Sequence, residues 1–381
     1  MAAMAVDAAA VPGTEHHPHA RAVLGAALTP GAGASHAYLF HGPAGTGKRT
    51  AARAFAAALL AEGAADPQGA RARVERGAHP DLTWVVPSGA HELLVSDVDA
   101  PVVSAAARTP FESSRRVFVI ERADTMNEEA GNRMLKTLEE PAPFVHLILL
   151  TDRPGEVMPT IASRCQHVRF DPLPAEDIAR RLEAEHGVDP PTTRACARLA
   201  LGAGDRALRL AVGEGPALRA AAERFARAAL AGEMASRPWR DLLARAHRRG
   251  DAAVAELDED HQRRRELLDR RERRRADTEH AERARRAHRR AKTQALDLGL
   301  SLVGLWYRDL ACTAWGAAEL ACNCDREAEL AADVEGRDPQ TLRTAVELVE
   351  ETRQRLALNV AEELACEALG YRLEEVLGGG G

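Results

Sequence analysis

The sequence predicts an α/β domain built on a parallel sheet, followed by two helical regions. Four short apolar runs are typical of buried strands, and helical segments separate them over about 130 residues. This alternation is typical of a parallel sheet with helices on its faces. After residue 170 the strand pattern stops, and the chain becomes rich in alanine, leucine and arginine. The length of 381 residues is sufficient for two or three domains, each with its own core.

Local patterns place the elements of the first region. The strands expected from continuous apolar runs lie at residues 38–40, 82–86, 117–120 and 147–150. One helix is expected at 51–60. A second helix is expected to begin at Thr125, because Thr125 and Glu128 have the spacing of a capping box, and to end before Pro141. The Asp-Pro-Leu-Pro string at 171–174 then predicts a domain boundary near residue 171.

Charge is segregated in the C-terminal half of the chain. Residues 263–292 carry fourteen basic and six acidic side chains, a local net charge of +8 that leaves −14 on the rest, given the overall −6. Apolar residues are almost absent after Leu268, so this segment lacks the seam of a coiled coil. We expect a solvated helix whose charges offset one another; the alternative is an arm that contacts DNA phosphates or a partner. Helical periodicity returns at 296–310 and 342–356.

The composition excludes several classes of protein. The longest apolar stretch, at residues 298–306, is shorter than the roughly 20 residues of a membrane helix. The N-terminus carries Asp7 where a signal peptide would have basic residues. We therefore expect a cytoplasmic protein that does not contact a membrane. The six cysteines are scattered, and the Cys322–Cys324 spacing suits no common zinc site, so we expect reduced thiols and no metal ligands.

A phosphate-binding loop follows the first expected strand. The string Gly-Pro-Ala-Gly-Thr-Gly-Lys at 42–48 matches G-x-x-x-x-G-K between a strand and a helix. The chain contains only three lysines, which makes a chance match improbable. Backbone N–H groups at Gly42, Gly45 and Gly47 can converge on phosphate oxygens, and Lys48 can reach the terminal phosphates. These four residues are the candidate nucleotide-binding residues.

Two departures from this pattern affect residues that ATP hydrolysis requires. Arg49 stands where a serine or threonine would hold magnesium, and Thr50 lies one position later, rotated by about 100° around the helix. Glu121, after the strand at 117–120, could hold magnesium, but Arg122 replaces the carboxylate that would activate water and cannot accept a proton. Thr50 and Glu121 thus complete the candidate nucleotide site. Two interpretations stay open, a scaffold loop without nucleotide and a loop that binds ATP or ADP with magnesium.

Three strings resemble the bacterial DNA polymerase III clamp-loader AAA+ family. They are His-Ala-Tyr-Leu-Phe-His-Gly-Pro at 36–43, Leu-Lys-Thr-Leu-Glu-Glu-Pro at 135–141 and Ser-Arg-Cys at 163–165. The resemblance covers residues 36–172, and more weakly 202–210 and 359–369. It implies an α/β P-loop AAA+ domain at 1–172, a small helical lid at 173–235 and an all-helical collar at 236–381, with the charged helix at about 256–292.

The resemblance also implies a function. Members of this family open a ring-shaped sliding clamp and place it on primed DNA, while motor subunits hydrolyse ATP. It implies a largely non-hydrolysing stator that supplies Arg164 to a neighbouring motor as an arginine finger in trans. The implied partners are motor subunits of the gamma/tau type, the delta subunit, the sliding clamp and primer-template DNA, within a hetero-oligomer. The alternatives are an active motor ATPase of the gamma/tau type and a DNA-binding protein that reuses the scaffold.

The resemblance bears on cofactors and on four further side chains. Many relatives carry four cysteines that form a zinc module, but residues 61–78 contain none, so we expect no zinc and no required cofactor. Lys136, Glu139 and Glu140 fit a structural helix end and a partner contact equally well. Arg206 matches the position of a second nucleotide-sensing arginine only loosely.

Overall fold

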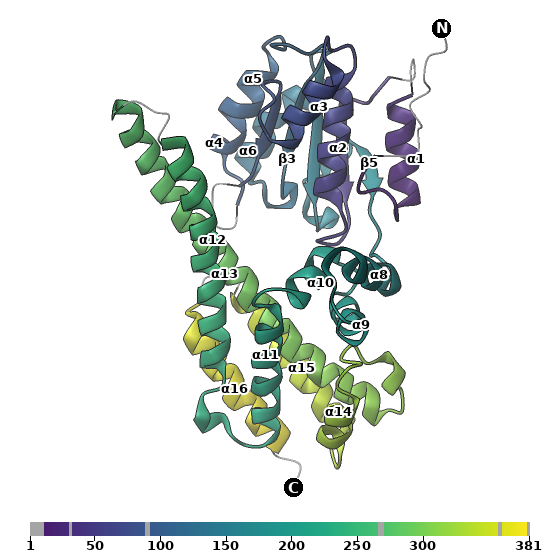
Figure 1. Ribbon diagram of the computed structural model, residues 1–381, viewed down its shortest axis with the longest axis vertical. Helices are drawn as coiled ribbons and strands as arrows, with labels where there is room; N and C mark the ends of the chain where they lie inside the picture. Colours follow the sequence, from purple (N-terminus) through teal and green to yellow (C-terminus); the bar gives the residue numbers. More distant parts are fainter. Residues whose placement is uncertain (1–10, 30–32, 88–91, 266–269, 357–359, 379–381) are drawn as a thin grey trace. The chain divides into compact units, whose positions relative to one another are not determined.

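The structure is a computed structural model that describes residues 11–29, 33–87, 92–265, 270–356 and 360–378. Two compact units divide the chain (Figure 1). The first unit comprises Met1–Leu173 together with Gly202–Gly204, and the second comprises Pro174–Leu201 together with Asp205–Gly381.

A five-stranded sheet with the order β2-β3-β4-β1-β5 forms the centre of the first unit, and all of its strand pairs are parallel. Its strands are β1 (Ala37–His41), β2 (Leu82–Val85), β3 (Arg116–Ile120), β4 (Val145–Thr151) and β5 (Gln166–Arg169). Its helices are α1 (Pro18–Ala27), α2 (Lys48–Ala61), α3 (Pro67–Glu75), α4 (Val95–Val98), α5 (Ser104–Ala106), α6 (Glu128–Glu139) and α7 (Pro159–Ala162). Short π or 3-10 turns lie at η1 (Asp99–Val103), η2 (Ala123–Thr125) and η3 (Pro154–Glu156). The predicted α/β fold with a parallel sheet is confirmed.

Hydrophobic cores cover both faces of this sheet. Side chains alternate along a strand, so Tyr38 and Phe40 of β1 pack with Phe55 of α2, while Leu39 packs in the other core with Met134 of α6. A strand buried on both faces is apolar at nearly every position, which explains the continuous runs in the sequence. This packing holds the carboxyl ends of β1, β3 and β4 at one edge of the sheet.

Two local predictions are corrected. The strand β5 escaped the sequence pattern because it reads Gln-His-Val-Arg, in which Val168 is the one apolar and buried residue. The helix α6 begins at Glu128 rather than Thr125, because the Asn127 side chain accepts the Ala130 N–H at 2.9 Å and caps the helix. Thr125 instead ends η2, where its hydroxyl donates to the Arg122 carbonyl at 2.9 Å.

The described residues of the second unit form helices joined by turns and loops. Its helices are α8 (Ala175–His186), α9 (Pro190–Leu199), α10 (Gly204–Ala211), α11 (Gly215–Leu230), α12 (Trp239–Arg265), α13 (Arg270–Ala314), α14 (Glu327–Val334), α15 (Pro339–Leu356) and α16 (Glu362–Gly378). Short 3-10 turns lie at η4 (Met234–Ser236) and η5 (Ala318–Leu320). No helix of the described residues combines the length and the apolar composition that crossing a membrane requires.

The charged segment forms part of a helical hairpin and not a single solvated helix. The helices α12 and α13 lie side by side (Figure 1). Polar pairs connect them, since His261 Nε2 lies 2.8 Å from Asp277 and His280 Nε2 lies 2.6 Å from Asp258. The two imidazoles stack with ring centroids 4.0 Å apart. The prediction of one charged helix at about 256–292 is corrected, because α12 ends at Arg265, α13 begins at Arg270, and histidine–aspartate pairs connect the two helices.

A buried histidine makes the stability of the first unit depend on pH. Burial lowers the pKa of His146, whose Nδ1 donates to the Ser35 carbonyl at 2.9 Å. The folded state therefore favours the neutral imidazole. Its stabilisation is complete above the unfolded value of about 6.5 and is lost as pH falls through the lowered folded value. We expect the urea concentration at half unfolding to be lower at pH 5.5 than at pH 7.5. The substitution His146→Gln should make this difference smaller.

The matched control is His186→Gln, which alters an exposed histidine on α8. Between pH 7.5 and pH 5.5, its urea unfolding midpoint is expected to change by the same amount as that of the unaltered chain. Equal pH dependence in the two variants would contradict a role for His146.

Candidate functional site

The phosphate-binding loop connects β1 to α2 through three glycines with positive φ. The φ angles are +143° at Gly42, +75° at Gly45 and +97° at Gly47. A Cβ on Gly42 would lie 2.0 Å from the Phe170 carbonyl oxygen, so a larger residue does not fit. Gly47 occupies the N-cap of α2 in the left-handed region, which glycine adopts without strain. The structure therefore brings Gly42, Gly45 and Gly47 together at the start of a helix, as the sequence predicted.

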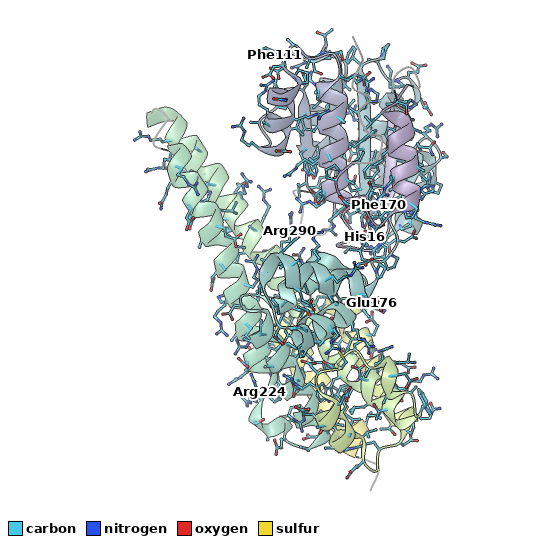
Figure 2. All side chains as sticks on the ribbon, turned by 45° about the vertical axis from the view of Figure 1, so that its right-hand side comes forward. His16, Phe111, Phe170, Glu176, Arg224 and Arg290 are labelled. Carbon is cyan, nitrogen blue, oxygen red and sulfur yellow. The ribbon has the colours of Figure 1, made fainter. Side chains whose placement is uncertain are left out.

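Segments outside the motif enclose this loop. His17 Nε2 donates to the Thr46 carbonyl at 2.7 Å, and the Gly204 N–H donates to the Gly45 carbonyl at 3.0 Å. The His17 ring also packs edge-on against Phe170, which Figure 2 labels, with centroids 4.9 Å apart. Sequence reasoning missed His17, because nothing in its local sequence indicates a contact 29 residues away.

Lys48 is buried at the loop, where three oxygen atoms surround its ammonium group. Its Nζ donates to the carbonyls of Gly42 and Pro43, both at 2.5 Å, and lies 2.7 Å from a carboxylate oxygen of Asp152. Asp152 directly follows β4, and the sequence analysis did not single it out. An incoming phosphate would compete with these oxygens for the same positive charge.

Arg49 pairs with the acid that the motif would use for magnesium. Its Nε lies 2.9 Å from Glu121 Oε1, and the Trp84 indole donates to the same oxygen at 2.6 Å. The Glu121 side chain is 14% exposed, whereas that of Arg49 is 68% exposed. Thr50 lies instead beside Gly13, where a Cβ on Gly13 would be 3.1 Å from Thr50 Cβ. The carboxylate of Glu121 thus already has a cationic partner.

Arg122 adopts the left-handed region with φ 54° and ψ 49°, which is uncommon for an arginine. Its carbonyl accepts the Thr125 N–H at 2.9 Å and so forms the tight turn η2. The turn directs Asp124, whose side chain is 4% exposed, to the Thr151 hydroxyl at 2.8 Å and to Arg153 at 3.1 Å. Asp124 therefore connects the ends of β3 and β4.

The candidate arginine finger lies between α7 and β5. Arg164 Nη2 donates to Glu139 Oε1 at 2.6 Å, and its Nη1 donates to the Thr160 carbonyl at 2.8 Å. The side chains of Arg164 and Glu139 are 36% and 48% exposed. Two of the three strings that carried the resemblance thus meet in space, through the last residue of α6. For Glu139, this gives the structural contact that the sequence left open.

Arg206 lies in the second unit, where its Nη2 donates to the Ser301 hydroxyl at 2.8 Å. Burial lowers the pKa of Arg206 to about 10, so the guanidinium stays charged at neutral pH. In the structure, Arg206 therefore makes a contact within the second unit, with α13.

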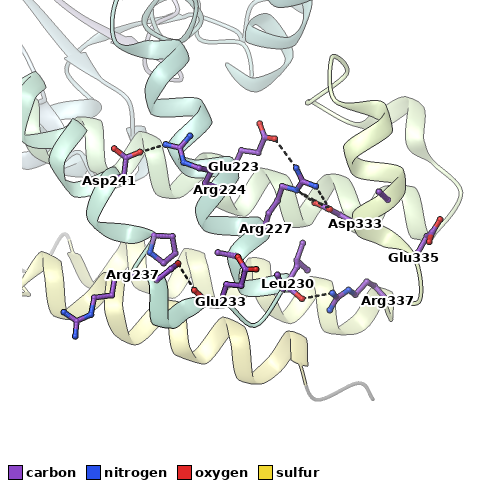
Figure 3. Close-up of a pocket in the computed structure, with 15 residues that line it drawn as sticks. Glu223, Arg224, Arg227, Leu230, Glu233, Arg237, Asp241, Asp333, Glu335 and Arg337 are labelled. Carbon is purple, nitrogen blue, oxygen red and sulfur yellow. Dashed lines mark hydrogen bonds and ion pairs between the residues drawn. The ribbon is translucent and has the colours of Figure 1, made fainter.

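The second unit also contains a pocket of about 660 Å³ among α11, α12 and α14 (Figure 3). Arginines and acids line it together, and they pair with each other. Arg227 lies 3.0 Å from Asp333, and Arg224 contacts Asp241. Two of its lining arginines are therefore held by acids of the same pocket.

Comparisons with known proteins identify relatives of the first unit. Residues 19–174 match the family described as "DNA polymerase III, delta subunit". The chain is 38% identical over 169 residues to DNA polymerase III subunit delta' of Bacillus subtilis (strain 168). The aligned region covers 43% of this chain and 50% of the relative. It is 37% identical over 161 residues to subunit delta' of Pseudomonas aeruginosa, covering 40% and 49%. It is also 33% identical over 150 residues to subunit tau of Bacillus subtilis, covering 39% and 27%. The chain spans about half the length of the two delta' relatives.

Proposed function

We propose that this chain is the delta prime subunit of a clamp loader. The premise is that its N-terminal unit is of the DNA polymerase III delta prime type. In this role it is a stator that helps to load the sliding clamp onto primed DNA. It hydrolyses no ATP itself and supplies Arg164 to a neighbouring motor subunit. The observation that carries the proposal is the ion pair between Arg49 and Glu121, together with the partial exposure of Arg164 elsewhere in the same unit.

The residues at the loop do not fit a magnesium nucleotide. Magnesium binds oxygen ligands, but Arg49 places a guanidinium at the ligand position and also neutralises Glu121. Arg122 has no lone pair with which to accept a proton from water. The proposal therefore contains no hydrolytic step at this loop and requires no nucleotide, magnesium or zinc. Gly42, Gly45, Gly47 and Lys48 then serve to shape the edge of the sheet.

Arg164 is available for a partner because its own ion pair is weak. A pair between side chains that are 36% and 48% exposed contributes about 0–1 kcal/mol, so it orients the guanidinium without locking it. At a neighbouring motor site the guanidinium would stabilise charge on the transferring phosphoryl group. We place this chain in a cytoplasmic hetero-oligomer with gamma/tau-type motor subunits, a delta subunit, the sliding clamp and primer-template DNA.

The second candidate function is an active motor ATPase of the gamma/tau type, because the chain is also related to a tau subunit. A motor requires magnesium-dependent ATP turnover by the chain itself. A stator requires that ATP turnover by the loader depend on Arg164.

The isolated chain is expected to bind ATP no more tightly with magnesium than without it. The double variant Arg49→Thr/Arg122→Glu restores a hydroxyl after the lysine and a carboxylate after Glu121. We expect it to bind ATP at least about tenfold more tightly when magnesium is present, a change of about 1.4 kcal/mol. Isothermal titration calorimetry with and without magnesium measures both affinities.

The matched control is Arg71→Thr, which removes an exposed arginine from α3. Its ATP affinity should equal that of the unaltered chain. Magnesium-dependent turnover by the unaltered chain would overturn the stator and favour the motor.

A further inference from the structure

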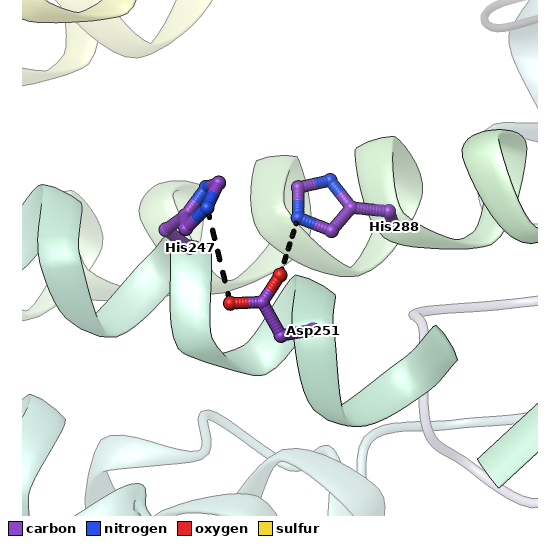
Figure 4. A group of neighbouring side chains, drawn as sticks. All are labelled: His247, Asp251 and His288. Carbon is purple, nitrogen blue, oxygen red and sulfur yellow. Dashed lines mark hydrogen bonds and ion pairs between the residues drawn. The ribbon is translucent and has the colours of Figure 1, made fainter. Parts of the chain in front are cut away.

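Three metal-binding side chains converge between α12 and α13 (Figure 4). His247 and Asp251 are four residues apart on α12 and so project from one face of that helix. His288 of α13 approaches from the other side. His288 Nε2 lies 3.2 Å from one carboxylate oxygen of Asp251, and His247 Nε2 lies 3.8 Å from the other. The three donor atoms all lie within 4.8 Å of one another.

This arrangement suits a divalent transition metal. Zinc binds imidazole nitrogen and carboxylate oxygen at about 2.0–2.2 Å, which places neighbouring ligand atoms about 3.4 Å apart in a tetrahedron. The separations of 3.2 Å and 3.8 Å, which run from the two imidazoles to different oxygens of the carboxylate, are close to that value. The side chains of His247 and Asp251 are both 60% exposed, so water can complete the coordination.

A glycine makes room for the third ligand. Gly250 is buried in the middle of α12, where glycine weakens a helix relative to alanine. A Cβ at this position would lie 2.7 Å from His288 Nε2 and 2.8 Å from its Cδ2. The missing side chain therefore forms a cradle for the imidazole and allows it to reach Asp251.

Carboxylates balance the basic residues around the cluster. Arg248 lies 3.8 Å from Glu214, and Arg249 lies 3.4 Å from Glu256. Lys292, one turn beyond His288, lies 2.5 Å from Glu362. These pairs reduce the repulsion that an approaching cation would meet.

The other histidine–aspartate pairs of the hairpin differ from this cluster. His261 pairs with Asp277 and His280 pairs with Asp258, so each of those carboxylates serves one imidazole. Asp251 serves two imidazoles, and both turn Nε2 toward it. This is the donor set that a single ion can share.

We propose that His247, Asp251 and His288 bind one zinc ion that connects α12 to α13. The sequence predicted no metal ligands, because the cluster unites residues separated by 37 positions and contains no cysteine. Two imidazole nitrogens and one carboxylate oxygen supply the ligands, which are donor types that zinc prefers. The proposal is independent of the clamp-loader function.

The test is a titration of the full chain with zinc at pH 7.5 after removal of metal by a chelator. We expect one zinc ion per chain and a rise in Tm on binding. His288→Ala is expected to weaken zinc binding more than about 100-fold, because even changes outside the ligand set cost about 10- to 100-fold. Absence of stoichiometric binding, or unchanged affinity in His288→Ala, would overturn the site.

Gly250→Ala is the sharper variant because it keeps all three ligands and favours the helix. We expect its Tm without metal to equal or exceed that of the unaltered chain, while zinc binds at least about tenfold more weakly. The matched control is His280→Ala, whose zinc affinity should not change. An equal loss in His280→Ala, or full affinity in Gly250→Ala, would contradict the proposed geometry.

Cobalt(II) distinguishes this cluster from the free cysteines. Nitrogen and oxygen ligands give weak visible absorption, whereas thiolates add an intense charge-transfer band in the near ultraviolet. We expect the weak bands alone, and we expect His288→Ala to remove them. A thiolate band in the one-to-one complex would assign the ion to cysteine and overturn the proposal.

Discussion

A clamp loader that contains the Arg164→Ala form of this chain is expected to hydrolyse ATP about 10³-fold more slowly at the neighbouring motor site. The expectation rests on the proposed function. A guanidinium that neutralises the transferring phosphoryl group contributes about 10³ to 10⁵ in rate, and alanine supplies no charge there. Turnover is measured with DNA and clamp present, in loaders whose other motor sites are inactive. Assembly, followed by gel filtration, should not change.

Glu139→Gln separates this role from a structural one. If Arg164 only holds α6 through its ion pair, both variants should impair the loader equally. If Arg164 acts on the neighbour, Glu139→Gln should retain most of the turnover, because the arginine remains. The matched control is Arg181→Ala, an exposed arginine that pairs with Glu185 on α8. Unchanged turnover in Arg164→Ala would remove this residue from the mechanism.

The second large effect is expected from Asp309→Ala, which should lower the free energy of unfolding by about 3–5 kcal/mol, because each buried donor left without an acceptor costs about 1–3 kcal/mol. Asp309 is fully buried in α13. One of its oxygens accepts the Cys322 N–H at 3.0 Å, and the other accepts the backbone and side-chain N–H groups of Asn323, both at 2.8 Å. Alanine would leave these donors without an acceptor in a buried site.

Urea unfolding followed by tryptophan fluorescence measures this loss, since three of the four tryptophans lie in the second unit. Glu347→Ala on α15 is the matched control, because its side chain is 62% exposed and pairs with Arg343 one helix turn away. It should change the unfolding free energy by less than about 0.5 kcal/mol. A loss for Asp309→Ala as small as that of the control would show that the network contributes little to stability.

The sequence predicted four strands of the sheet and missed the edge strand β5. The strands β1, β3 and β4 are short apolar runs because helices cover both faces, and the edge strand β2 is also mostly apolar. The edge strand β5 buries only Val168, so its pattern is too weak to predict. The start of α6 was misplaced because Thr125 and Asn127 are both good capping residues, and only the backbone geometry selects Asn127.

The candidate site divides in the same way. The loop was predictable because glycine is the residue that adopts a positive φ without strain, and Gly42, Gly45 and Gly47 all have one. Lys48 follows them at the spacing of the motif. The partners of these residues were not. Asp152 at Lys48 and His17 at the loop come from other parts of the chain, and their local sequences carry no sign of the contact.

By itself, the sequence determined the fold class, the loop and the residues that depart from a hydrolytic motif. These features are local, because hydrophobic period, glycine spacing and residue type act on neighbouring positions. Only the tertiary structure decided that Arg49 neutralises Glu121, that Glu139 orients Arg164, and that a buried glycine lets His288 reach Asp251. Each of these contacts depends on the register of packed elements, which no local pattern specifies, because the same side chains satisfy the same periodicity in many registers.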